Sequence, residues 1–86
     1  MITTQYIAQQ LVSYLNHQIS FDQLVHWSEQ NLLEGGFEPG QETAIREALG
    51  RLAAADAEGF GLLWEDCDEL MHLLGYKLKI DAAKVA

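Results

Sequence analysis

Apolar residues recur at helical spacing through most of the chain, and this pattern predicts four helices. The predicted helices cover about residues 4–17, 20–34, 40–54 and 63–74. The second has the clearest start, because Ser20 and Gln23 have the spacing of a capping box. Gly35 ends this helix and Gly75 ends the fourth, since glycine adopts the left-handed conformation at low cost.

Each predicted helix has one apolar face, which we assign to the core. The inward positions are Ile7, Leu11, Tyr14 and Leu15, then Phe21, Leu24, Val25, Ser28 and Leu32, then Ala44, Ile45, Ala48, Leu49 and Leu52, and finally Trp64, Cys67, Leu70, Met71 and Leu74. The opposite side of the second helix carries Asp22, His26, Glu29 and Leu33. Gly50 falls in the middle of the third helix, where it should cost roughly 1 kcal/mol relative to alanine.

The apolar pattern changes after Gly75. Tyr76, Leu78 and Ile80 alternate with lysines, a period of two that is typical of an extended strand, and a short tail follows over 81–86. No other stretch is typical of a strand, so this one either covers the helices as irregular chain or pairs with its copy in a second subunit. The prediction is one mainly α domain over 1–86, a compact four-helix unit with a short extended or β C-terminal segment.

Charge is unevenly distributed over the 86 residues, whose net charge is −8. Residues 1–76 carry 12 acidic and two basic residues, a balance of −10, whereas residues 77–86 have a balance of +2. A nucleic-acid-binding protein needs a basic face that this chain lacks. No apolar run approaches the roughly 20 residues that span a bilayer, and no signal peptide pattern opens the chain. The single cysteine excludes an intrachain disulfide. We therefore expect a cytoplasmic protein without cofactors that binds neither nucleic acid nor membranes.

Acidic residues of the fourth predicted helix are the candidate metal ligands. Glu69 and His72 have the i, i+3 spacing of di-metal helical bundles, and Glu65 shares their face. This face lies opposite the apolar stripe of the same helix, so we expect it to be a solvated surface. A metal site at these residues is the lesser alternative.

Two further segments contain residue types used in catalysis or phosphate binding, and neither has the surroundings that such chemistry requires. Cys67 lies on the apolar stripe among acidic neighbours, which raise a thiol pKa where a nucleophile needs it lowered. Gly59-Phe60-Gly61 lacks the preceding strand, the third glycine and the lysine of a phosphate-binding loop, so a loop with Phe60 buried is expected. No catalytic residue is predicted.

A partner-binding patch is predicted around the end of the second helix. Its apolar members are Trp27, Leu33 and Phe37, and its acidic rim is Glu29, Glu34 and Glu38. Apolar patches with charged rims often mark interaction sites. The alternative is that the aromatic members belong to the core.

The run from Tyr14 to Trp27, YLNHQISFDQLVHW, resembles the opening of small bacterial helical proteins. Many of these are uncharacterised, and some are immunity proteins that neutralise colicin-type toxins. The run GLLWEDC, over 61–67, is similar to a recurring element of the uncharacterised group, although Leu63 stands where a polar cap is expected. The resemblance implies a small, acidic, non-catalytic helical protein matched to a basic nuclease surface. It assigns no functional residue.

Together these features predict a non-enzymatic interaction module that binds a basic protein partner in a toxin-neutralising or regulatory role. Electrostatic steering and a few apolar anchors would supply the binding. The alternative is a structural homodimer or larger homo-oligomer that pairs through Tyr76, Leu78 and Ile80.

Overall fold

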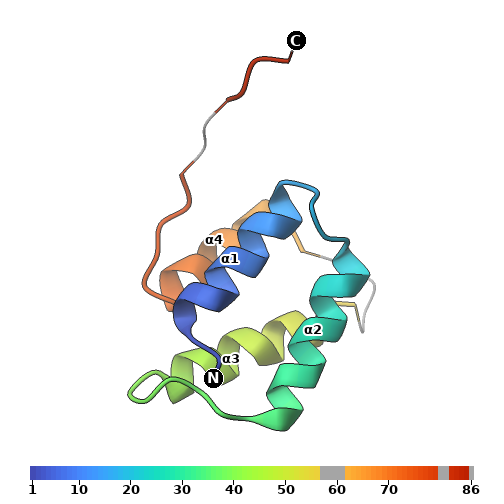
Figure 1. The fold of residues 1–86 in the computed structure, drawn as a ribbon. Coiled ribbons are helices and arrows are strands. Elements are labelled where there is room, and N and C mark those ends of the chain that lie inside the picture. The colour runs from blue at the N-terminus through green and yellow to red at the C-terminus, as the bar shows by residue number, and fades with distance from the viewer. Residues whose placement is uncertain (57–61, 80–81, 86) are drawn as a thin grey trace.

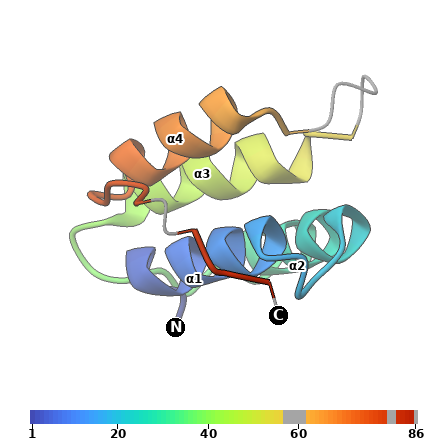
Figure 2. The ribbon, with the colours of Figure 1, turned by 90° about the horizontal axis from the view of Figure 1, so that it is seen from above.

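The computed structural model describes residues 1–56, 62–79 and 82–85 of the chain. Its helices are α1 (Thr4–Leu15), α2 (Phe21–Glu34), α3 (Glu42–Ala53) and α4 (Trp64–Leu73) (Figure 1). The four predicted helices and the mainly α fold class are therefore confirmed. Seen from above, α1 and α2 form one layer and α3 and α4 form the other (Figure 2).

Side-chain caps fix the starts of α1 and α2. The Thr3 hydroxyl accepts a hydrogen bond from the Tyr6 N–H at 3.0 Å. At α2 the predicted capping box is complete: the Ser20 hydroxyl accepts from the Gln23 N–H at 3.1 Å, and the Gln23 side chain accepts from the Ser20 N–H at 2.8 Å. These bonds satisfy backbone donors that have no partner within the helix.

Helices α1 and α4 end with the same backbone arrangement, a Schellman motif. In α1 the Gln18 N–H donates to the Ser13 carbonyl, and in α4 the Tyr76 N–H donates to the Met71 carbonyl, each at 2.8 Å. The motif needs a left-handed residue, which is His17 in α1 (φ 62°) and Gly75 in α4 (φ 89°). Because His17 takes this role, α1 ends at Leu15 rather than near residue 17.

The core contains most of the residues predicted to face inward. The largest fully buried side chains are Ile7, Leu11, Leu24, Ile45, Leu49, Leu52, Leu70, Cys67 and Ser28. Ser28 is satisfied there because its hydroxyl donates to the Leu24 carbonyl at 2.8 Å. The inward assignment of Trp64 is wrong: 46% of this residue is exposed. Trp64 is the first residue of α4. A side chain at a helix end is buried only if a neighbouring element extends beyond that end and packs against it.

The N-terminal residues contribute a contact that the helical pattern does not predict. Ile2 is buried, its N–H donates to the Gly36 carbonyl, and its carbonyl accepts from the Glu38 N–H, both at 2.9 Å. These bonds form an isolated parallel bridge between Ile2 and Phe37. The bridge attaches the start of α1 to the connection between α2 and α3.

The segment after α4 leaves the helical body as extended chain (Figure 1). Residues 76–79 belong to no strand, and Leu78 packs against the core as a partly buried side chain. Ile80 lies outside the described residues, so pairing between copies through this segment stays a prediction. None of the helices in the described ranges combines the length and the apolar content that a membrane span requires.

Candidate functional site

The outer face of α2 presents a leucine among carboxylates. Asp22, His26, Glu29 and Leu33 are all exposed, as their spacing predicts, because Leu24, Val25 and Ser28 take up the buried face. Leu33 is 88% exposed, so most of its apolar surface is in contact with solvent. Exposed Glu34 follows it at the end of the helix.

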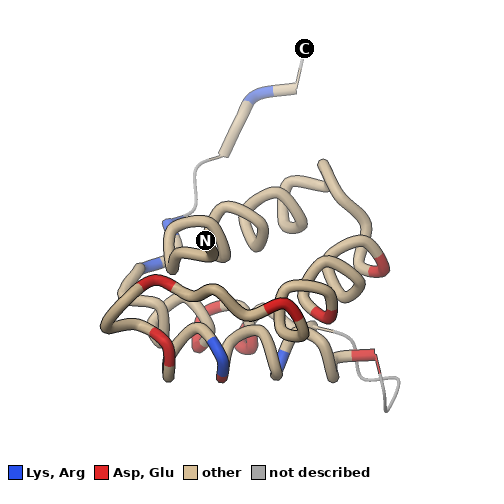
Figure 3. The backbone as a smooth tube through the Cα atoms, turned by 60° about the horizontal axis from the view of Figure 1, so that its bottom comes forward, with Lys and Arg blue, Asp and Glu red and all other residues tan. Residues whose placement is uncertain are grey.

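Negative charge on α2 has no positive partner within the described structure. Residues 1–76 contain only two basic side chains, and both are engaged elsewhere. Arg51 on α3 forms an ion pair with Glu69 on α4 at 3.0 Å, and Arg46 lies over the Phe37 ring at 5.0 Å from its centroid. Figure 3 shows the acidic positions along α2 and the connection that follows, whereas α1 carries no charged residue.

Three members of the predicted patch also make contacts within the protein. Trp27 is half-buried and stacks against Tyr6, with ring centroids 5.4 Å apart. Phe37 is half-buried under Arg46 and packs against the core. Glu38 is partly buried, and its carboxylate accepts a hydrogen bond from the Thr4 N–H at 3.2 Å and so caps α1. The structure leaves Glu29, Leu33 and Glu34 together on α2.

The candidate metal ligands of α4 lie on its solvent-exposed side. Glu65, Glu69 and His72 are exposed, and Glu69 is paired with Arg51. Asp66 accepts a hydrogen bond from the Leu63 N–H at 2.9 Å, which satisfies a donor at the helix start. Within the described ranges, no three histidine, cysteine, aspartate or glutamate side chains lie close enough to hold a metal ion.

Cys67 lies in the core on the inner side of α4. Its burial, and to a smaller extent the charge of Asp66, raises the pKa of the thiol. A raised pKa leaves little thiolate near neutral pH, so this environment opposes nucleophilic chemistry. The predicted glycine-rich loop at 59–61 lies outside the described residues.

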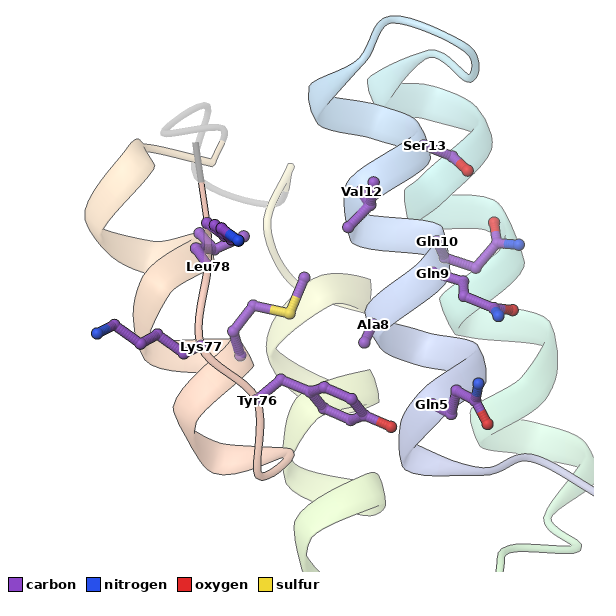
Figure 4. A pocket seen from close by; sticks show the side chains of 11 residues that line it. Gln5, Ala8, Gln9, Gln10, Val12, Ser13, Tyr76, Lys77 and Leu78 are labelled. Carbon is purple, nitrogen blue, oxygen red and sulfur yellow. The ribbon is translucent and has the colours of Figure 1, made fainter. Parts of the chain in front are cut away.

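A groove beside α1 is a feature that sequence reasoning missed. It has a volume of about 690 Å³ and lies between α1 and the segment Tyr76–Lys79 (Figure 4). One feature of the sequence could have indicated this groove: the polar positions of α1 include glutamines and no charged residue, whereas the other helices carry charged residues. Two of the predicted oligomerisation residues, Tyr76 and Leu78, line this groove.

Comparison of the chain with known protein families, with characterised proteins and with solved structures finds no match.

Proposed function

We propose that the protein is a non-enzymatic interaction module that binds a basic protein partner through the outer face of α2. Neutralisation of a nuclease toxin is the most specific form of this proposal, and regulation of a basic protein is the broader form. The observation that carries it is the 88% exposed Leu33 beside Glu29 and Glu34, with both nearby arginines engaged elsewhere.

The two kinds of side chain have different roles in this proposal. Burying a leucine on a partner contributes about 1.5–3 kcal/mol, so Leu33 would act as the apolar anchor. The exposed carboxylates would attract the partner before contact, which accelerates association and makes binding sensitive to salt. A partner complementary to this face would present a shallow apolar pocket flanked by lysines or arginines.

The test is affinity capture from the cells that make the protein, followed by titration of the purified partner. Three baits are compared: the unaltered protein, Leu33→Ala, and Glu29→Gln/Glu34→Gln. The expected partner has a basic surface, and its Kd rises when NaCl is raised from 50 to 300 mM, because this shortens the Debye length from roughly 13 Å to roughly 5.5 Å. Leu33→Ala should weaken binding about tenfold or more.

Glu42→Gln/Glu47→Gln is the matched control, because it removes two carboxylate charges from α3 and leaves α2 intact. This control should retain most of the affinity. Equal capture by all baits, or a Kd indifferent to ionic strength, would contradict the proposal.

A further inference from the structure

The groove beside α1 has an apolar floor and a rim of one charge sign. Ala8 and Met71 lie at its base, and Val12, Tyr76 and Leu78 form its sides. Val12 and Tyr76 are 43% and 40% exposed, so apolar surface is open to solvent here. In Figure 4, Ala8 and Val12 point from α1 toward the C-terminal segment, and the Tyr76 ring reaches from that segment toward α1.

Lysines supply all of the formal charge around this groove. Lys77 and Lys79 belong to its lining, and the Lys77 side chain points from the C-terminal segment away from α1 (Figure 4). The part contributed by α1 is uncharged and carries the amides of Gln5, Gln9 and Gln10. This arrangement is opposite to that of α2, which has carboxylates and no lysine or arginine. The charged residues that line this groove are therefore basic, although the net charge of the protein is −8.

The backbone along one side of the groove is available for pairing. The Tyr76 N–H is bonded to the Met71 carbonyl, but the described part of the chain gives no backbone hydrogen bond to Lys77, Leu78 or Lys79. Leu78 is half-buried and its two lysine neighbours are exposed, as in a strand with one covered face. An extended peptide can add to such an edge through main-chain hydrogen bonds.

We propose that this groove binds an extended peptide of another protein, in which acidic residues alternate with apolar ones. The carboxylates pair with Lys77 and Lys79, and the apolar side chains lie over the floor between Val12 and Tyr76. A second copy of the chain fits less well, because antiparallel pairing centred on Leu78 places Lys77 opposite Lys79 of the other copy. Like charges directly opposite each other destabilise a strand pair.

The site is independent of the α2 face, so the two proposals fail separately. The probe is a fluorescein-labelled peptide of alternating glutamate and valine, titrated by fluorescence anisotropy, with a lysine–valine peptide as the opposite-charge probe. We expect saturable binding of the acidic peptide, no binding of the basic one, and amide NMR shift changes at Ala8, Val12 and Leu78. Lys77→Glu/Lys79→Glu should weaken binding at least about fivefold, because two attractions become repulsions.

Lys84→Glu is the matched control, since this exposed lysine lies in the tail outside the groove lining and its replacement makes the same charge change at one position. Val12→Asn tests the apolar contact without adding charge. It should also weaken binding, while the circular dichroism spectrum stays that of the unaltered helical protein. Equal affinity for both peptides, or an equal loss in Lys84→Glu, would overturn the proposal. A second result would also overturn the proposal: sedimentation shows a dimer that does not bind the peptide, and truncation after residue 75 converts this dimer to a monomer.

Discussion

Replacing Gly50 by alanine should stabilise the protein, whereas the same replacement at Gly75 should destabilise it. A Cβ atom added at either position meets no atom within 4 Å, so packing does not distinguish the two sites. Backbone conformation does. Gly50 lies inside α3, while Gly75 has φ 89° in the Schellman motif that ends α4.

The magnitudes follow from this difference. In a helix interior, glycine is about 0.8–1.0 kcal/mol less favourable than alanine, so Gly50→Ala should gain about that amount. A left-handed alanine costs roughly 1–2 kcal/mol, and alanine recovers about 0.4–1 kcal/mol by restricting the unfolded chain. Gly75→Ala should therefore lose roughly 1 kcal/mol.

The assay is urea and thermal unfolding, followed by the helical circular dichroism signal. For a domain of this size, 1 kcal/mol shifts the Tm by roughly 4–8 °C, so the two variants should move in opposite directions by a measurable amount. The urea m-value should stay constant, since neither change alters the surface exposed on unfolding. Two shifts of the same sign would refute the reasoning, because they would mean that conformation at these glycines does not decide their effect.

Four further outcomes are expected. Ser20→Ala should cost about 1 kcal/mol in urea unfolding, because it removes the acceptor that caps α2, and an unchanged midpoint would contradict this role. His17→Gly should raise the Tm, with a gain of up to about 1 kcal/mol, since it relieves a left-handed non-glycine residue. Leu49→Ala should cost about 2–5 kcal/mol through the cavity it leaves, against a total stability of order 5–15 kcal/mol, and a Tm near that of the unaltered protein would count against a fully buried site. Finally, the pKa of the Cys67 thiol is raised in the folded protein above its ordinary value of about 9.0, which applies to the unfolded chain. Above about pH 9.0, unfolding therefore releases a proton from this thiol. Stability is thus retained below this pH and lost as pH rises, and Cys67→Ala should show the shallower decline in pH-dependent unfolding.

Local patterns were sufficient to predict α2, including its first turn. Ser20 and Gln23 interact within four residues, so no distant part of the chain is needed to form the capping box. The exposed positions of Glu29 and Leu33 follow from the same helical period, because the opposite face is apolar.

Residues that depend on distant contacts were not predictable in the same way. The contacts that partly cover Trp27 and Phe37 come from Tyr6 and Arg46, which lie 21 and nine residues from them in the sequence. Glu38 caps a helix that begins 34 residues earlier, at Thr4. Trp64 has the helical spacing of a core residue, but helical spacing does not predict whether another element packs against the end of a helix.

The sequence by itself therefore determined the number of helices, their buried faces and the excess of negative charge, since these depend on residue type and short-range period. Tertiary structure alone decided which exposed groups remained without partners. Arg51 pairs with Glu69 and Arg46 lies over Phe37, so within the described residues the carboxylates of α2 near Leu33 have no ion-pair partner. The extended segment after α4 lies beside the uncharged α1, and the groove between them exists only because these two distant stretches meet.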